Sequence, residues 1–425
     1  MRVWLLQRAE PTPHDNDGAQ RLLRTGILAR TLIAAGHQVT WFTSTFDHYN
    51  RRQRYDADRR VAVEPGYDVH YLHGPSYRRN ISLGRVRNHT TVARRFAAFA
   101  AETTERPDIV VASIPTAELA LAGVKFGRTH GIPVVLDIRD LWPDVFYDVL
   151  PGFLKPLVHL ATHSMRRALE QATRDATAII GLTGGFLDWG LERGGRTRGP
   201  DDRVFFMGYQ GKKRVDADPV AAGRFWDELG VRHDPATLTV AFIGTLGFVA
   251  DFDPVFEAAR ILQADGVPVR FIICGDGARR AKIETAAAEL PNVVFPGWVT
   301  EDRIQALFDR AEIGLTPYIE STNFILNVTN KPAEYMSGGW AIANSLDRGA
   351  LQTLLSERDC GFSYGGSGRT LATKLARLAL DPDLLEGLRQ RARGTFAELF
   401  HGESVYGEMV TYLEEVARKA AGERV

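Results

Sequence analysis

Short apolar runs alternate with helical patterns along the first half of the chain. Residues 3–6 form the first apolar run, and apolar side chains then recur at helical spacing from residue 22 to residue 33 before Gly36 ends the segment. Further strand-like runs occupy residues 39–43, 108–112, 133–138 and 178–182. Apolar strands that alternate with helices are typical of a parallel sheet with helices on both faces. The pattern therefore predicts a doubly wound α/β domain.

The same alternation starts again after a Gly/Arg/Asp-rich stretch at residues 194–203. Its strand-like runs are residues 238–243, 269–274, 293–295, 313–316 and 341–343. We expect two Rossmann-like domains, residues 1–200 and residues 201–403, with residues 404–425 crossing back onto the first. Ligands of open α/β sheets bind at the carboxyl ends of the strands, so we expect a central cleft where the two sheets face one another.

Composition narrows the functional classes. Lys and Arg number 52 and Asp and Glu also number 52, so no excess of positive charge favours a nucleic-acid partner. Two cysteines, Cys274 and Cys360, are too few for a disulfide framework and fit a reducing compartment. Residues 2–7 are too short for the apolar core of a secretory signal, and no apolar run approaches about 18 residues. We expect a cytoplasmic protein that does not cross a membrane.

The segment "NVTNKPAEYMSGG" at residues 327–339 has the features of a helix that begins at a ligand. Pro332 is tolerated in a first helical turn, and either Thr329 or Asn330 can be the N-cap. The free amides and the positive dipole end of such a helix bind phosphate, and Lys331 adds a cation for the same anion. The segment therefore predicts a nucleotide-diphosphate site.

Glu334 in the same segment has two interpretations. A carboxylate beside a phosphate site can accept hydrogen bonds from the two hydroxyls of a sugar diol. Alternatively, Asn330 caps an ordinary helix and Glu334 only faces its dipole, as many first-turn acids do.

Other chemistries lack their motifs. No histidine pair has metal-ligand spacing on one helix face, and Asp251 and Asp253 are not backed by a strand as the Asp-x-Asp pair of metal-dependent transferases is. No Gly-x-Ser-x-Gly elbow supports a serine hydrolase. We expect neither a metal nor another cofactor.

Four motifs carry a resemblance to a known family. The chain contains a Gly-Asp-Gly turn at 275–277, "NVVFPGWV" at 292–299, Asn-Lys-x-x-Glu-Tyr-Met-x-x-Gly from residue 330 and "DIRDLWPD" at 137–144. This set resembles family-4 retaining glycosyltransferases of the GT-B fold over nearly the whole chain. The Asp-x-Arg-Asp-x-Trp-Pro signature is similar to that of a subgroup that builds surface polysaccharides, related to N-acetylfucosamine transferases.

The resemblance implies donor-binding roles in the second domain. Glu334 would hold the ribose hydroxyls of the donor nucleotide. Lys331 and the Thr329–Asn330 backbone would face the diphosphate, and Gly244–Thr245 would lie under the phosphates. Trp298–Val299 would flank the base.

In the first domain, the resemblance implies that the loop carrying Gly18 closes over the diphosphate and that Arg139 and Asp140 face the reacting sugar. Many members have histidine where this chain has Arg139. We expect Asp140 to position the acceptor hydroxyl.

The chain departs from the family pattern at a second acidic position. Many members have another glutamate ahead of the one at Glu334, and this chain has Leu326 there. Glu320 or Asn327 could take its place.

Members of the family also place an arginine and a lysine just after the strand that ends at Gly244. This chain has "GTLGFVADFDP" there, with no cation before Arg260. Stabilising the charge of the leaving diphosphate is usually the largest catalytic contribution, so other cations are needed. Beyond Lys331, the candidates are Arg139, Lys212, Lys213 and Arg279.

A basic segment suggests a membrane-facing surface. Residues 77–95 contain Arg78, Arg79, Arg85, Arg87, Arg94 and Arg95. The apolar segment 150–160 follows the Trp-Pro signature, and together the two resemble a patch that rests on anionic headgroups at the inner face of a membrane. A solvated basic helix face is the alternative.

The sequence thus predicts a metal-independent, retaining hexosyltransferase. It would move a sugar from a nucleotide donor, expected to be a UDP-sugar, to a polyprenyl-linked or oligosaccharide acceptor in cell-envelope polysaccharide assembly. The family resemblance implies that the donor's own phosphate receives the acceptor proton. A non-catalytic partner of another glycosyltransferase is the main alternative, and a nucleotide-sugar epimerase on the same fold is a third.

Overall fold

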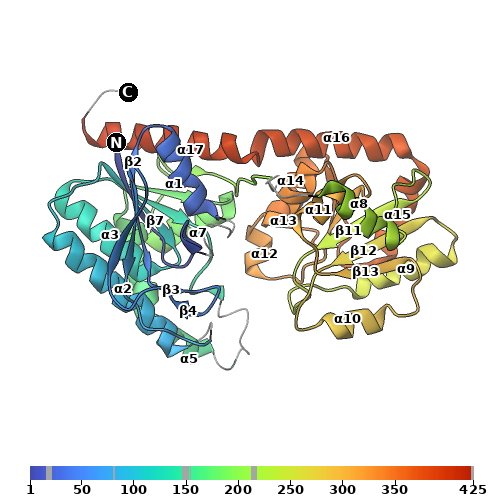
Figure 1. Cartoon of the computed structure of the whole chain (residues 1–425), viewed down its shortest axis with the longest axis horizontal. Helices are drawn as coiled ribbons and strands as arrows, with labels where there is room; N and C mark the ends of the chain where they lie inside the picture. Colours follow the sequence, from blue (N-terminus) through green and yellow to red (C-terminus); the bar gives the residue numbers. More distant parts are fainter. Residues whose placement is uncertain (16–21, 80–81, 146–152, 154, 212–217, 423–425) are drawn as a thin grey trace. The chain divides into compact units, whose positions relative to one another are not determined.

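The computed structural model describes the chain except for residues 16–21, 80–81, 146–152, 154, 212–217 and 423–425. The chain forms two compact units, one of Met1–Phe206 with Glu403–Val425 and one of Met207–Gly402 (Figure 1). The sequence predicts a boundary at residue 200, and in the structure the first unit ends at residue 206 and the second begins at residue 207. The binding role of each domain stays a prediction.

The first unit is built on a sheet that has eight strands within the described residues, in the order β10-β9-β8-β7-β1-β2-β6-β5. The strands are β1 (Arg2–Leu6), β2 (Gln38–Ser44), β5 (Arg59–Glu64), β6 (Tyr67–Leu72), β7 (Ile109–Ile114), β8 (Val134–Ile138), β9 (Ala178–Gly181) and β10 (Arg203–Val204). All neighbours are parallel except β5, which pairs antiparallel with β6 at the edge. A short antiparallel pair, β3 (Phe46–Asp47) and β4 (Arg52–Gln53), lies outside this sheet.

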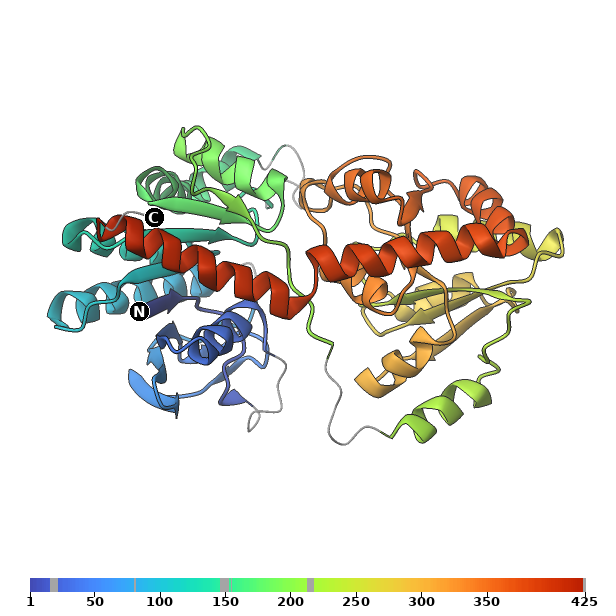
Figure 2. The same ribbon diagram turned by 90° about the horizontal axis from the view of Figure 1, so that it is seen from above.

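Helices cover both faces of this sheet because its strands are apolar on both sides. On β1, Val3 and Leu5 join the core that α17 and α1 cover, while the intervening Trp4 packs against Phe96 of α2 and Phe126 of α3. Figure 2 shows α17 lying across the strands of this unit. The described helices of the first unit are α1 (Arg24–Ala34), α2 (Leu83–Glu102), α3 (Ala117–His130), α5 (Lys155–Ala161), α6 (His163–Asp175), α7 (Gly184–Gly194) and α17 (Gly402–Ala420).

The second unit has a fully parallel sheet of six strands within the described residues, in the order β13-β12-β11-β14-β15-β16. The strands are β11 (Leu238–Ile243), β12 (Val269–Cys274), β13 (Val293–Gly297), β14 (Ile313–Thr316), β15 (Ala341–Asn344) and β16 (Gly361–Ser363). The described helices are α8 (Pro219–Glu228), α9 (Asp253–Ala264), α10 (Arg280–Ala286), α11 (Glu301–Phe308), α12 (Thr322–Leu326), α13 (Asn330–Ser337), α14 (Ala350–Arg358), α15 (Gly368–Leu380) and α16 (Pro382–Leu399).

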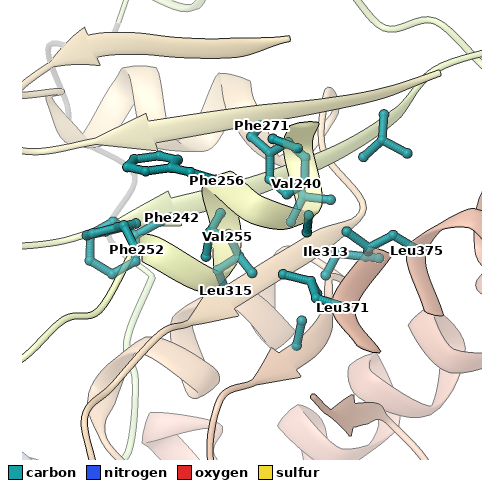
Figure 3. Packing of buried hydrophobic residues seen from close by; sticks show 14 of the residues in the cluster. Val240, Phe242, Phe252, Val255, Phe256, Phe271, Ile313, Leu315, Leu371 and Leu375 are labelled. Atoms are coloured by element: carbon teal, nitrogen blue, oxygen red, sulfur yellow. The ribbon is translucent and has the colours of Figure 1, made fainter. Parts of the chain in front are cut away.

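Aromatic and branched side chains hold the second sheet against its helices. Figure 3 shows Phe242 of β11 near Phe252, the N-cap of α9, and Val255 within α9, with Leu371 of α15 in the same core. The rings of Phe242 and Phe252 lie 5.1 Å apart in an edge-to-face arrangement. This packing fixes the carboxyl end of β11, where the predicted phosphate loop begins.

The two sheets, one fully parallel and one parallel except for its edge strand β5, each have helices on both faces and confirm the predicted fold class of two doubly wound α/β domains. Among the described residues, no helix combines the length and apolar character needed to span a bilayer.

Candidate functional site

The loops that follow β11, β12 and β13 are joined by backbone hydrogen bonds. The amide of Gly244 donates to the carbonyl oxygen of Cys274 (3.0 Å), and the amide of Gly275 donates to that of Gly297 (2.8 Å). The strands end at the same edge of the sheet, so the three loops form one continuous strip there. The predicted phosphate loop and the predicted base-binding segment both belong to this strip.

The Gly-Asp-Gly turn makes the close approach of these loops possible. Gly275 has a φ of +142°, which L side chains rarely adopt, and a Cβ added there would overlap the carbonyl oxygen of Gly244. The turn is therefore required for the strip to form at all.

Helix α13 begins beside this strip. Its N-cap is Thr329, which has an extended backbone and whose side chain makes no capping hydrogen bond within the described part of the chain. The Thr329 hydroxyl instead donates to the Tyr318 hydroxyl (3.4 Å). The first-turn amides of Asn330 and Lys331 are thus not capped by Thr329, as an anion-binding helix end requires.

Tyr335 fixes the position of α13. Its buried hydroxyl accepts a hydrogen bond from the amide of Ile243 at the end of β11 (2.9 Å). The ring lies directly over β14, where Gly314 leaves the necessary space because a Cβ there would overlap it. The helix end is therefore held close to the phosphate loop by packing rather than by its own cap.

Lys331 and Glu334 form an ion pair on the first turns of α13. Lys331 Nζ lies 2.7 Å from Glu334 Oε2, and Glu334 is only 4% exposed. Burial raises the pKa of the Cys274 thiol, and the positive charge of Lys331 opposes that rise. Lys331 therefore acts at the end of β12, on the strip of loops described above.

The remaining predicted residues of this unit lie in different surroundings. Trp298 is 66% exposed and Val299 is buried. Glu320 is exposed and pairs with Arg348 on the surface. Asn327 ends α12, and its buried Oδ1 has no hydrogen-bond partner among the described residues.

Arg279 lies next to the cation-poor loop after β11. Its amide donates to the carbonyl oxygen of Leu246 (3.0 Å), and its guanidinium carbon is 5.8 Å from the centre of the Phe248 ring. Within the described part of the chain it forms no ion pair, whereas the adjacent Arg280 is paired with Glu284 (2.8 Å). Of the four cation candidates from the sequence, Arg279 is the one that the structure places here; Lys212, Lys213 and the predicted Gly18 lie outside the described residues.

Arg139, in the first unit, belongs to a buried ion network. It pairs with Asp137 (2.7 Å) and with Glu10, and it donates to the Thr25 hydroxyl (2.8 Å). Burial lowers the pKa of Arg139, but Asp137 and Glu10 outweigh burial and the pKa is raised. In this arrangement the guanidinium is already engaged on several sides, and its contact with the reacting sugar stays a prediction.

Sequence reasoning missed the other members of this network. Arg24 is fully buried and its Nε donates to Asp137 Oδ2 (2.9 Å). The sequence does contain one indication of this network. Arg24 lies among the apolar residues at the start of α1, where a buried charge needs a partner of opposite charge.

Asp140 lies on the loop after β8. Its Oδ1 accepts a hydrogen bond from the amide of Leu141 (2.8 Å). Burial raises the pKa of Asp140, which the Leu141 amide and the positive charge of Arg85 oppose. The guanidinium of Arg85 lies 4.0 Å from the centre of the Trp142 ring, so the Trp-Pro signature packs against α2. A half-buried carboxyl with a raised pKa is suited to hold or accept a proton.

Across the described residues, no group of three or more His, Cys, Asp or Glu side chains is arranged to hold a metal ion.

Comparison with known proteins gives matches in both halves of the chain. Residues 23–206 match the family described as "Glycosyl transferase 4-like domain", and residues 237–381 match "Glycosyl transferases group 1". A curated relative, the 2-deoxystreptamine glucosyltransferase of Streptomyces kanamyceticus, is 22% identical over 209 residues, which are 48% of this chain and 52% of the relative. The chain thus spans about half the length of that relative.

Solved structures resemble the whole chain. Sucrose-phosphate synthase from Thermosynechococcus elongatus has a TM-score of 0.67 at 16% identity and covers 98% of each chain. Anabaena HepE, solved with UDP and glucose, has a TM-score of 0.61 at 15% identity and covers 98% of this chain and 100% of its own. The two family matches, one in each unit, and this likeness in fold show that the chain belongs to the glycosyltransferases with the GT-B fold.

Proposed function

We propose that the protein transfers a sugar from a nucleotide diphosphate donor, with the α13 end of the second unit as its donor site. The observation that carries this proposal is the combination of uncapped first-turn amides, Lys331 and buried Glu334 beside the phosphate loop at Gly244. The amides and Lys331 suit the diphosphate, and Glu334 suits the ribose hydroxyls. A UDP-sugar is the proposed donor, which the UDP complex of HepE supports.

Transfer proceeds with retention and without a metal. The bond between the anomeric carbon and the diphosphate oxygen breaks, a bond to the acceptor oxygen forms on the same face, and the acceptor proton passes to the leaving phosphate oxygen. Such a route needs cationic groups at the diphosphate rather than a protein nucleophile. Lys331 and Arg279 supply this charge, and Arg279 takes the place of the cations absent from the loop after β11.

Asp140 positions the acceptor hydroxyl in the proposed reaction. Its half-buried carboxyl, whose pKa is raised, and its location at the carboxyl edge of the first sheet support this role. The acceptor is a polyprenyl-linked or oligosaccharide glycan of the cell envelope, related to the substrates of N-acetylfucosamine transferases, which the Trp-Pro signature supports.

A membrane-facing surface in the first unit would bring the enzyme to a lipid-linked acceptor. Arg78, Arg79, Arg87, Arg94 and Arg95 are exposed on and before α2, whereas Arg85 is buried and does not belong to this surface. Exposed apolar residues accompany them on and beside α5, namely Phe153, Leu157 and Leu160. Exposed arginines and exposed apolar side chains in one unit suit an interface with anionic lipid.

Flotation on vesicles that contain anionic lipid tests this surface. Leu157→Asp and Leu160→Asp should reduce salt-sensitive binding, while Leu380→Asp, an equally exposed leucine of the second unit, should not. Equal flotation of all three variants would contradict the assignment.

A non-catalytic partner of another glycosyltransferase is the second candidate, favoured by the absence of a basic residue from the loop after β11. Thermal shift and donor hydrolysis across UDP-, GDP- and dTDP-sugars distinguish the two. Binding with slow donor hydrolysis supports the enzyme. Tight binding with no turnover, even with acceptor fractions present, supports the partner.

A further inference from the structure

The loop that carries Asp140 begins where β8 ends and turns back within a few residues. The amide of Asp144 donates to the carbonyl oxygen of Leu141 (2.7 Å), which closes a tight turn directly after Asp140. On the other side, the amide of Arg139 donates to the carbonyl oxygen of Ile114 at the end of β7 (3.0 Å). These bonds fix the backbone on both sides of Asp140, so the direction of its carboxyl depends on the contacts of the side chain itself.

Trp142 makes such a contact with Asp140. Burial raises the pKa of Asp140, and a hydrogen bond from the Trp142 side chain opposes that rise, as the amide of Leu141 does. The indole N–H can only donate, so the Asp140 carboxyl is the acceptor of this bond. A carboxylate has about four acceptor positions, and the Leu141 amide and the indole occupy two of them. The remaining positions are left to an acceptor hydroxyl.

The indole ring of Trp142 is in turn held by α2. The guanidinium carbon of Arg85 lies 4.0 Å from the ring centre, and Arg85 is 8% exposed. The ring of His89, which is buried, lies with its centre 6.0 Å away at an angle of 42°. A guanidinium that is shielded from water and packs on an indole makes one of the stronger cation–π contacts. The direction of the indole N–H is therefore set by α2.

The charged and titratable groups around this contact act on Asp140 in one direction. Burial lowers the pKa of Arg85 to about 10, so Arg85 keeps its positive charge at pH 7 and favours the ionised form of Asp140. Burial also lowers the pKa of His89 well below 6.5, so that imidazole is neutral at pH 7. Glu118 of α3 faces His89 at 3.8 Å on the side away from the loop, and burial raises the pKa of its carboxyl.

The loop has a second anchor on α7 that does not involve Trp142. The Asp144 carboxylate accepts a hydrogen bond from Nε1 of Trp189 (2.7 Å) and pairs with Arg193. The loop should therefore keep its place when only the N–H of Trp142 is removed. A substitution of phenylalanine for Trp142 then tests the hydrogen bond to Asp140 rather than the attachment of the loop.

We propose that Trp142 is a positioning residue for sugar transfer, whose indole N–H directs the Asp140 carboxyl toward the acceptor hydroxyl while Arg85 and His89 hold the indole in place. This inference rests on the proposed function, because the role of Asp140 belongs to that proposal. It gives the Trp-Pro signature a task in the reaction beyond its packing against α2.

Trp142→Phe keeps an aromatic ring and removes the N–H. We expect the turnover rate at pH 7 to fall about tenfold or more, because a hydrogen bond to a charged group is lost, while UDP affinity stays unchanged. The lost bond favoured the ionised carboxyl, so the fall in rate on acidification should begin at a higher pH than in the wild type. The pH–rate profile measures this shift.

A titration of ¹³C-labelled aspartate carboxyls by NMR measures the same shift without turnover. The Asp140 signal is the one that is missing from Asp140→Asn, and its midpoint should move to higher pH in Trp142→Phe. Trp226→Phe is the matched control, since it removes another buried indole N–H, which donates to the carbonyl oxygen of Arg303 in the second unit (2.8 Å). This control should leave the Asp140 midpoint and the pH–rate profile unchanged.

Trp189→Phe separates the orientation of Asp140 from the attachment of the loop, because it weakens the α7 anchor and keeps the Trp142 N–H. An equal shift of the Asp140 midpoint in this variant would overturn the inference, as would an unshifted midpoint or an unchanged turnover rate in Trp142→Phe. If the wild type transfers no sugar but the midpoint still moves in Trp142→Phe, the proposed function fails while the contact between Trp142 and Asp140 stands.

Discussion

Lys331 Nζ lies 2.7 Å from Glu334 Oε2, so the side chains proposed for the diphosphate and for the adjoining ribose bind each other in the free protein. Donor binding would draw Lys331 to the diphosphate and leave the Glu334 carboxylate to the ribose. The ion pair holds both side chains near their binding positions before the ligand arrives, which reduces the entropy lost on binding.

Replacing Glu334 by alanine should weaken UDP binding about 10- to 100-fold, because hydrogen bonds to a charged acceptor are lost. Calorimetric titration with UDP measures this. Glu301→Ala is the control, since Glu301 is a first-turn acid of α11 in the same unit. If both variants only lower the melting temperature and retain UDP affinity, Glu334 does no more than face its helix dipole.

Arg279→Ala should lower the turnover rate about 100-fold, since a charge that stabilises the leaving diphosphate is removed. Arg280→Ala changes the neighbouring arginine, which Glu284 already neutralises, and should have a small effect. Steady-state rates of UDP release report both variants. Equal rates for the two would mean that Arg279 does not reach the diphosphate.

Gly275→Ala should disrupt the strip of loops after β11, β12 and β13. The new Cβ would overlap the Gly244 carbonyl in a backbone conformation that alanine rarely adopts, so we expect loss of UDP binding and a lower melting temperature. Gly247→Ala is the matched control on the neighbouring loop after β11, where the nearest side-chain atom is 3.7 Å from the added Cβ. Retained UDP affinity in Gly275→Ala would show that these loops can move apart without cost to the site.

Asp140→Asn should abolish transfer while leaving UDP affinity unchanged. The wild-type rate should fall on acidification at a pH above 3.8, the ordinary pKa of aspartate, because burial raises the pKa of this carboxyl. A transfer rate that persists in Asp140→Asn would exclude the proposed role.

The same substitution has a predicted effect on stability. A carboxyl whose pKa is raised on folding favours the protonated native state, and this contribution is lost as the pH rises through the folded-state value. Asn, which is always neutral, should therefore raise the melting temperature at pH 7, and the difference should vanish below pH 3.8. Thermal denaturation across this range checks the sign.

The sequence was informative where local patterns determine structure. The alternation of apolar runs and helices predicted both sheets, and Pro332 marked the first turn of α13. The sequence left Thr329 and Asn330 as alternative N-caps of α13. The hydrogen bonding of Thr329 depends on a residue outside the helix, because its hydroxyl bonds to Tyr318 instead of to the first turn of α13. The roles proposed for these residues remain predictions from the family resemblance.

Contacts between distant segments could not be predicted in the same way. Arg24 and Asp137 are 113 positions apart, and Arg139 and Glu10 are 129 apart, so only the fold brings these charges together. Arg8 is 80 positions from Asn88 and follows an ordinary first strand. No spacing rule connects such residues, because their proximity depends on strand order in the sheet.

The packing of α17 on the first sheet has a consequence for biosynthesis. Tyr406, Met409 and Leu413 complete the buried layer over β1 and β2, so the first two hundred residues cannot bury that layer while the ribosome is still translating the second unit. During that interval the nascent N-terminal half exposes an apolar face of its sheet to chaperones and to other nascent chains on the polysome. A fragment ending near residue 206 should aggregate when expressed alone, and co-expression of residues 403–425 should rescue it.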